Sequence, residues 1–420
     1  MDLNTLTLSS SSTVNWHLIP GGISAPNGFK ACGIKANLKP SSKLDLALLL
    51  APENSICAGT FTKSLFRASC IDLCTERLRL SNGEIRAVII NSGQANACTG
   101  KWGLEDSLKI TKEVASQLSL NSENVLICST GLIGERIPLK NILAGIHNLS
   151  EEISPEGGLN AARAIMTTDL VEKQISLEAN LGGRRVRIGG MAKGSGMIHP
   201  NMATMLGFIT CDARVSYEIW KTVIQQIVDS SFNAISVDGD TSTNDAVLAF
   251  SSGSELDEQY FDELINGLLI VCQYLAKAIA RDGEGANCLI EVKVTGAKND
   301  VDARLIARSV CSSSLVKTAI HGKDPNWGRI AAACGRSGVH FNVNEFSLAI
   351  GPFQLISKGE LVSFERIDLI SYMEQRMNGD YFVDDIIDIN ISVGEKSGQA
   401  TAWGCDLSED YIRINADYTT

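Results

Sequence analysis

The stretch KGSGMIHPNMATMLGFITC, Lys193 to Cys211, lies near the middle of a chain of 420 residues. It begins with a turn of small residues and a proline, and it ends in MLGFITC, an apolar run that predicts a buried strand. RRVRIGG, from Arg184, predicts a strand before it, and SYEIWKTVIQQIVDSSF, from Ser216, predicts an amphipathic helix after it. The centre of the chain is therefore expected to be a loop held between two strands.

Strand-like and helix-like segments alternate from this centre toward both ends. Strands are predicted at 44–51, 85–91, 124–128, 246–252, 288–296 and 346–351, and helices at 103–118, 139–153, 158–168, 261–280, from 301 onward and at 366–377. The final residues, ending in DYIRINADYTT, read as a terminal strand pair. This alternation, punctuated by glycine-rich turns, predicts an α/β (α+β) enzyme with a smaller C-terminal lobe from about residue 290.

The composition excludes several classes of function. A net charge of −11 with scattered lysines and arginines argues against nucleic acid as a partner and favours a small polar substrate. The N-terminus lacks the basic start and apolar core of a secretory signal, and no run of eighteen apolar residues predicts a membrane span. We therefore expect a cytoplasmic protein.

The twelve cysteines lie singly along the chain, which suits reduced and mostly buried thiols. Cys70 and Cys74 have helical i,i+4 spacing but no histidine nearby, and the five histidines form no ligand pattern. We expect no metal site.

Polar, glycine-containing loops adjoin several of the predicted strands, where binding groups collect. In STGLIG, the Thr130 hydroxyl and the Gly131 N–H could form a two-donor oxyanion site, or the pair could simply be a turn. DGDTSTNDA lacks the glutamate of a calcium loop, since Ala249 takes that place, so Asp238 and Asp240 are expected to order the loop through backbone N–H groups. Glu284, between two glycines, reads as a site carboxylate or as a solvent-facing turn.

Thr204 raises a separate question, because the opening stretch offers it no histidine or cysteine partner. A threonine can act as nucleophile when its own α-amine, of pKa about 7.7 to 8.0, is free to take the hydroxyl proton. That requires cleavage of the bond before it, and the small Ala203 would permit an N-to-O acyl shift. An ordinary strand threonine is the alternative on these residues alone.

Eight ordered motifs resemble those of the glutamate N-acetyltransferase family, the ornithine acetyltransferases of arginine biosynthesis. They are NSGQANACTG, STGLIGERIP, MTTD, GGMAKGSGMIHPNMATML, DGDTSTND, EGA, VKTAIHGKDPNWGRIAAACGRSG and ATAWGCDLSEDYIRINADYTT, and the match begins near Gly21. The resemblance implies an αββα-type sandwich like that of DmpA and the ornithine acetyltransferases. It also implies self-cleavage between Ala203 and Thr204, into an α chain of 1–203 and a β chain of 204–420.

The family's functional residues fall on matching positions of this chain. The resemblance implies Thr204 as nucleophile and Thr130 and Gly131 as the oxyanion pair. The implied substrate contacts are Thr167 or Thr168, Lys193, Thr204, Glu284, Asn415 and Thr420. A cationic Lys193 would pair with the α-carboxylate that N2-acetylornithine and glutamate share, and Glu284 would pair with the amine of ornithine. Contacts so near the C-terminus imply that the tail folds over the pocket.

The implied reaction is ping-pong transfer of acetyl from N2-acetylornithine to glutamate through an acetyl-threonine, by an α2β2 heterotetramer without a cofactor. Use of acetyl-CoA as a second donor stays open. A related N-terminal-nucleophile aminopeptidase or amidohydrolase is the alternative enzyme, and an uncleaved binding protein is the alternative outside enzymes. His199, Asn287, Cys288 and Lys323 depart from residues common in the family, and the first three bear on maturation or substrate choice.

Overall fold

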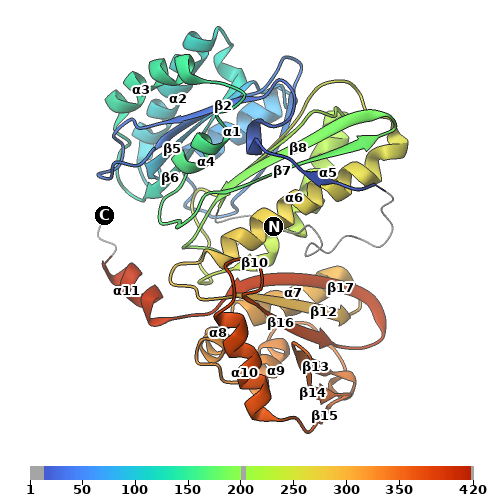
Figure 1. The fold of residues 1–420 in the computed structure, drawn as a ribbon. Helices are drawn as coiled ribbons and strands as arrows, with labels where there is room; N and C mark the ends of the chain where they lie inside the picture. The colour runs from blue at the N-terminus through green and yellow to red at the C-terminus, as the bar shows by residue number, and fades with distance from the viewer. Residues whose placement is uncertain (1–13, 200–204, 418–420) are drawn as a thin grey trace.

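The computed structural model describes residues 14–199 and 205–417, which form two bodies, one above the other in Figure 1. The upper body contains two sheets. A six-stranded sheet has the order β1 (His17–Leu18), β7 (Lys173–Leu181), β8 (Arg184–Lys193), β9 (Leu206–Cys211), β11 (Ala246–Ser251), β4 (Ile56–Phe61). A four-stranded sheet has the order β2 (Lys30–Ile34), β3 (Leu46–Leu50), β5 (Ala87–Gln94), β6 (Val125–Leu132).

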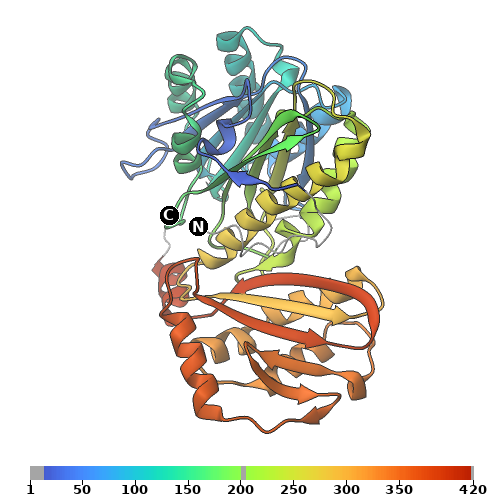
Figure 2. The same ribbon diagram turned by 45° about the vertical axis from the view of Figure 1, so that its right-hand side comes forward.

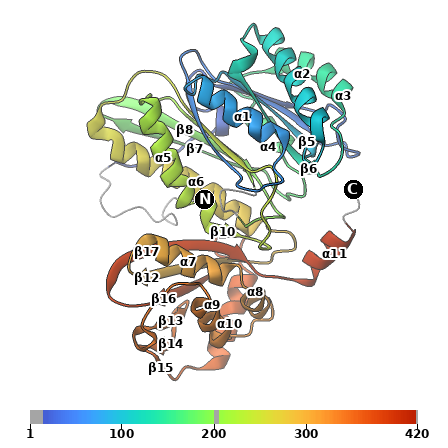
Figure 3. The same ribbon diagram turned by 180° about the vertical axis from the view of Figure 1, so that it is seen from behind.

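Helices cover the outer faces of these two sheets, as Figures 2 and 3 show from different sides. Those beside the four-stranded sheet are α1 (Ser69–Leu80), α2 (Gly100–Leu118), α3 (Leu139–Glu152) and α4 (Gly158–Ala164), and those on the six-stranded sheet are α5 (Tyr217–Asp229) and α6 (Phe261–Arg281). Along β9, Leu206 and Phe208 point into the core shared with the four-stranded sheet, whereas Ile209 and Cys211 point toward α5 and α6. This alternation makes an αββα sandwich, and the predicted fold class is confirmed.

The lower body is built on a seven-stranded sheet. Its order is β10 (Ile235–Ser236), β17 (Lys396–Cys405), β12 (Leu289–Gly296), β16 (Ile386–Ser392), β13 (Ser347–Ile350), β14 (Phe353–Ser357), β15 (Glu360–Leu361). The helices of this lobe are α7 (Asp300–Cys311), α8 (Ser314–His321), α9 (Trp327–Gly335) and α10 (Arg366–Met377). Helix α6 packs against β7 and β8 on one side and against β12 and β17 on the other, so it joins the two bodies.

Short 3-10 helices complete the fold at Gly22–Ser24, Ser122–Asn124, Phe232–Ala234, Glu258–Tyr260 and Val343–Glu345. Residues Glu258–Arg281 are long and apolar enough to cross a membrane, but 67% of their most apolar window is buried inside the protein, as in a core helix. All twelve cysteines are free, and Cys98 is the exposed one, so the prediction that the thiols are mostly buried is confirmed.

The structure differs from the prediction at three elements that contribute residues to the pocket described below or lie next to them. Strand β6 continues to Leu132 because its residues Ser129–Leu132 still pair with β5, so Thr130 and Gly131 lie within the strand. Helix α4 ends at Ala164, and a bend bound to Asp169 follows it. The chain after β17 forms a helix, α11 (Glu409–Asp417), rather than a strand. Glu409 and Asp410 in its first turn favour the helix, since they complement the positive end of the helix dipole.

Candidate active site

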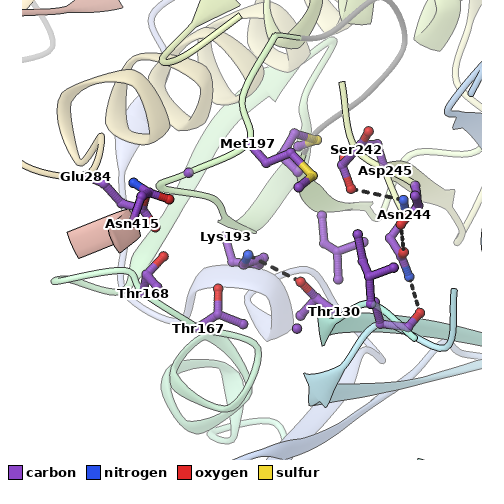
Figure 4. A pocket seen from close by; sticks show the side chains of 17 residues that line it. Thr130, Thr167, Thr168, Lys193, Met197, Ser242, Asn244, Asp245, Glu284 and Asn415 are labelled. Atoms are coloured by element: carbon purple, nitrogen blue, oxygen red, sulfur yellow. Dashed lines mark hydrogen bonds between the residues drawn. The ribbon is translucent and has the colours of Figure 1, made fainter. Parts of the chain in front are cut away.

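A pocket opens where the two sheets of the upper body meet α11, and Figure 4 shows it from close by. Its cavity is about 190 Å³. The lining residues are Ala95, Thr130, Gly131, Ile133, Thr167, Thr168, Lys193, Gly196, Met197, Met205, Leu206, Ser242, Thr243, Asn244, Asp245, Glu284 and Asn415. Hydroxyl, amide, carboxylate and ammonium groups converge there, which suits a small polar ligand.

Strand register brings distant parts of the chain to this edge. Lys193, the last residue of β8, pairs with Leu206, the first residue of β9. Leu206 in turn pairs with Ala246, the first residue of β11. Met205 and Asp245, which precede these two strands, therefore lie at the same sheet edge as Lys193 and line the pocket with it.

Thr130 and Gly131 enter the pocket from the four-stranded sheet. Gly131 has φ +125°, and a Cβ there would lie 2.2 Å from the Gly93 carbonyl oxygen, so only glycine fits this position. The Lys193 ammonium donates to Thr130 Oγ1 at 3.3 Å. Because the ammonium occupies an acceptor site of that oxygen, the Thr130 hydroxyl proton stays available for a ligand in the pocket.

Lys193 is the cation of the pocket wall. It is 8% exposed, and burial lowers its pKa below the ordinary lysine value, an effect that the Asp169 carboxylate partly opposes. Figure 4 shows its ammonium directed toward Thr130, inside the ring of labelled side chains. A buried cation with a neutral hydroxyl partner can still take an anionic ligand group.

Glu284 faces Lys193 from the opposite side. Asn415, on α11, donates through Nδ2 to Glu284 Oε2 at 2.8 Å, and the two side chains lie together in Figure 4. A Cβ at Gly196 would lie 2.4 Å from Glu284 Oε2, so the glycine of the opening turn admits the carboxylate. Glu284 is 9% exposed and is a pocket carboxylate rather than part of a solvent-facing turn.

The structure brings seven of the predicted site residues to this one pocket: Thr130, Gly131, Thr167, Thr168, Lys193, Glu284 and Asn415. Ala203, Thr204 and Thr420 lie outside the described residues. Met205, which follows Thr204 in the chain, lines the pocket. Of the two substrate contacts predicted near the C-terminus, only Asn415 lies among the described residues.

Sequence reasoning singled out DGDTSTNDA but chose its first two aspartates. Asp238 does accept from the backbone N–H groups of Met197 and Ile198, at 2.5 and 2.9 Å, as predicted. The residues of this motif that line the pocket are instead its later ones, Ser242, Thr243, Asn244 and Asp245. Their position just before the apolar run of β11 was the available signal.

The departures from the family pattern lie outside the pocket lining. Asn287 and Cys288 bind Asp406 through their backbone N–H groups, at 2.7 and 3.1 Å, and Lys323 occupies a left-handed turn after α8. His199 bonds to Ser236 Oγ at 3.0 Å and to Arg308 at 3.2 Å. Burial and Arg308 lower the pKa of His199 to about 4, so the neutral ring accepts from the arginine and ties the loop to the C-terminal lobe.

Within residues 14–199 and 205–417, no group of three or more histidine, cysteine, aspartate or glutamate side chains could hold a metal ion. The groups that line the pocket suit acid–base and acyl chemistry. The pocket offers a hydroxyl and a strand N–H as donors, a buried cation and a buried carboxylate, all around one small cavity.

Comparison with known proteins places the chain in a family of this chemical type. The ArgJ family model matches residues 30–420. The arginine biosynthesis bifunctional protein ArgJ of Prochlorococcus marinus strain NATL2A is 57% identical over 415 residues, 99% of each chain, and that of strain MIT 9313 is 58% identical over 418 residues, 100% of this chain and 98% of the other. The chain therefore belongs to the ArgJ family.

Among solved structures, the ornithine acetyltransferase of Mycobacterium tuberculosis, complexed with ornithine, matches with 38% identity and a TM-score of 0.41. The match covers 46% of this chain and 100% of that one.

Proposed function

We propose that the chain transfers the acetyl group of N2-acetylornithine to glutamate, which yields ornithine and N-acetylglutamate in arginine biosynthesis. The observation that carries the proposal is the convergence of Thr130, Gly131, Lys193 and Glu284 around Met205, in a chain with full-length ArgJ relatives. The relatives are bifunctional, and we propose acetyl-CoA as a second acetyl donor to glutamate.

The proposed chemistry begins with maturation. Cleavage between Ala203 and Thr204 produces an α chain of 1–203 and a β chain of 204–420, and it frees the α-amine of Thr204. That amine takes the proton of the Thr204 hydroxyl, whose oxygen attacks the acetyl carbonyl. The Thr130 hydroxyl and the Gly131 N–H stabilise the resulting oxyanion, and ornithine leaves as its nitrogen regains a proton. The amine of glutamate then attacks the acetyl-threonine ester, the bond from the acetyl carbon to Thr204 Oγ breaks, and that oxygen regains its proton as N-acetylglutamate leaves.

Substrate recognition follows from the charges of the pocket. Lys193 pairs with the α-carboxylate, and Glu284, held by Asn415, pairs with the side-chain amine of ornithine. Thr167 and Thr168 supply hydroxyl groups on the wall below Lys193. We also propose that two cleaved precursors assemble as an α2β2 heterotetramer in the cytoplasm. Thr420 would be the last of the substrate contacts.

An exchange assay tests the reaction. Purified protein, N2-acetylornithine and labelled glutamate should give labelled N-acetylglutamate, and a second reaction with acetyl-CoA in place of acetylornithine tests the second activity. Release of free acetate with no labelled product would instead indicate a hydrolase and contradict the proposal. Under denaturing conditions, mass spectrometry should show two pieces that disappear in Thr204→Ala.

A substitution of Thr130 tests its proposed role in stabilising the oxyanion. Thr130→Val keeps the shape of the side chain but removes one donor, so kcat should fall about 10²- to 10³-fold. Self-cleavage of this variant is followed by mass spectrometry, so that a loss of maturation is separated from a loss of transfer. A fully cleaved Thr130→Val protein with unchanged kcat would remove Thr130 from the mechanism.

A further inference from the structure

A second lysine lies behind the pocket wall, and the proposed reaction does not use it. Lys173, the first residue of β7, is 2% exposed and donates to Asp169 Oδ1 at 2.7 Å and to Asp282 Oδ2 at 2.6 Å. Both carboxylates are as deeply buried, at 2% and 1% exposed. Asp169, Lys173 and Asp282 are called the buried triad below.

The first carboxylate of the triad joins two walls of the pocket. Asp169 Oδ2 accepts from the backbone N–H of Thr167 at 2.9 Å, and Asp169 Oδ1 accepts from that of Gly194 at 2.7 Å. Thr167 lines the pocket, and Gly194 follows Lys193 directly. The segment that carries Thr167 and Thr168 is called the threonine loop below. One carboxylate, that of Asp169, therefore connects this loop to the residue next to Lys193.

The second carboxylate extends the connection to the opposite wall. Asp282 Oδ2 accepts from the N–H of Leu170 at 3.1 Å, and the Asp282 carbonyl accepts from Ser195 Oγ at 2.6 Å. The N–H of Glu284, two residues further on, donates to the Ser195 carbonyl at 3.0 Å. Lys173 thus bridges the segment that carries Thr167 and Thr168 to the segment that carries Glu284.

The triad also sets the electrostatics of the pocket. The ammonium of Lys173 and that of Lys193 both act on Asp169, and together they hold its pKa below the ordinary value although burial opposes them. The ionised Asp169 in turn favours the charged form of Lys193. Its neutral replacement would therefore make Lys193 easier to deprotonate.

We infer that Asp169, Lys173 and Asp282 are positioning residues of the substrate pocket, which hold the threonine loop, Lys193 and Glu284 at their mutual distances and keep Lys193 charged for a carboxylate ligand. This inference rests on the proposed function and deepens it. None of the three side chains needs to touch the substrate. Displacement of binding groups by about 1 Å can cost on the order of 10²-fold in rate, so the effect is measurable.

The test compares Lys173→Met, Asp169→Asn and Asp282→Asn with wild type in the glutamate exchange assay. Lys277→Met is the matched control, because Lys277 is also a buried lysine, pairs with Glu291 at 2.7 Å and lies outside the pocket lining. We expect Lys173→Met and Asp169→Asn to raise KM about 10- to 100-fold. We expect Lys277→Met to leave KM within about twofold.

A pH profile of KM separates positioning from loss of folded protein. The charged groups acting on Lys193 are Asp169, Lys173, Asp245 and Glu284, with Lys39 also within electrostatic range. In Asp169→Asn, KM for glutamate should begin to rise at a lower pH than in wild type, because the carboxylate that favours the Lys193 ammonium is gone. In Asp282→Asn the onset should move less, since Asp282 is bonded to Lys173 and to Leu170, whereas Asp169 accepts from Gly194 directly beside Lys193.

The outcomes divide as follows. Unchanged KM and an unchanged pH onset in Asp169→Asn, in protein that unfolds at the same temperature as Lys277→Met, would overturn the inference. If Lys173→Met does not fold, the two asparagine variants, which keep side-chain volume, decide the question. Wild-type protein without exchange activity would overturn the proposed function and this inference together, whereas an active wild type with unaffected variants overturns the inference alone.

Discussion

Two lysines at neighbouring positions of the strand pair β7 and β8 have opposite environments. Lys173 pairs in register with Ala192, so it lies beside Lys193 at the same edge of the sheet. Lys173 is bonded to two carboxylates, whereas Lys193 donates to the Thr130 hydroxyl. Burial lowers the pKa of Lys193, but the two carboxylates outweigh burial at Lys173 and raise its pKa.

The difference separates a charge that is paired inside the protein from a charge that lines the pocket. Two carboxylates at hydrogen-bond distance leave Lys173 little capacity to bind anything else. Lys193 retains donor capacity toward the cavity, at the cost of a less favourable ammonium.

The largest expected effect is on folding. Lys173→Met leaves two buried carboxylates facing each other without a cation, so the free energy of unfolding should fall by about 3–5 kcal/mol. Urea denaturation measures this loss. Lys277→Met should lose less, because its partner Glu291 also accepts from Trp403 Nε1 at 2.6 Å and is partly exposed. Equal losses in the two variants would erase the distinction claimed for the triad.

Lys193→Met should reduce activity strongly and change stability little, the reverse of what is expected for Lys173→Met. Loss of the cation opposite a bound carboxylate should lower kcat/KM about 10²- to 10³-fold, as for a buried charge pair that loses one partner. The free energy of unfolding should change by less than about 1 kcal/mol, because the folded state already disfavours this ammonium. Steady-state kinetics and urea denaturation check the pair of values. A stability loss as large as that of Lys173→Met would contradict the comparison.

As the pH rises into the alkaline range, Lys193 and Lys173 should change the free energy of unfolding in opposite directions. For Lys193, whose folded pKa lies below 10.5, the unfolded chain binds more protons between the two pKa values, so this residue makes stability rise with pH there. For Lys173, whose folded pKa lies above 10.5, the ion-pair contribution is present below 10.5 and is lost as pH rises through the folded pKa.

Subtracting the stability curve of each methionine variant from that of wild type isolates these two contributions. Difference curves with the same sign would show that one of the two directions is wrong.

The smallest expected effect concerns the tail. Asn415→Ala removes a 2.8 Å bond to Glu284 from an exposed helix, so KM for N2-acetylornithine should rise about 3- to 10-fold with little change in unfolding. Asp417→Ala serves as the control, because Asp417 lies in the same helix but is not among the residues that line the pocket. A KM equal to that of wild type would remove α11 from substrate binding.

Much of the fold could be predicted because its periodicity is local. The helix at 366–377 and the strand from Arg184 begin where the apolar patterns place them. The prediction failed for α11, where Ile412 and Ile414 alternate like strand residues but are exposed on a helix. No local pattern shows that Asn415 of this segment is bonded to Glu284, 131 positions earlier.

The residues of the candidate site also fall into those that the sequence identified and those that only the structure shows. Motif resemblance named Lys193, Glu284, Thr130 and Gly131, and the pocket contains them all. It did not find Asp245, whose place beside Met205 depends on the parallel register of β9 and β11. It also passed over Asp169, although MTTD was among the motifs, because nothing in those letters tells a pocket carboxylate from a buried ion-pair partner.

The sequence by itself determined which functional groups this protein has, where its local helices and strands form, and to which family it belongs. Only the tertiary structure decided which lysine is paired with carboxylates and which one faces the pocket. The reason is that electrostatic energies depend on distance and on exclusion of water, and the decisive partners, Lys173 and Asp282, are 109 positions apart in the chain but 2.6 Å apart in the fold.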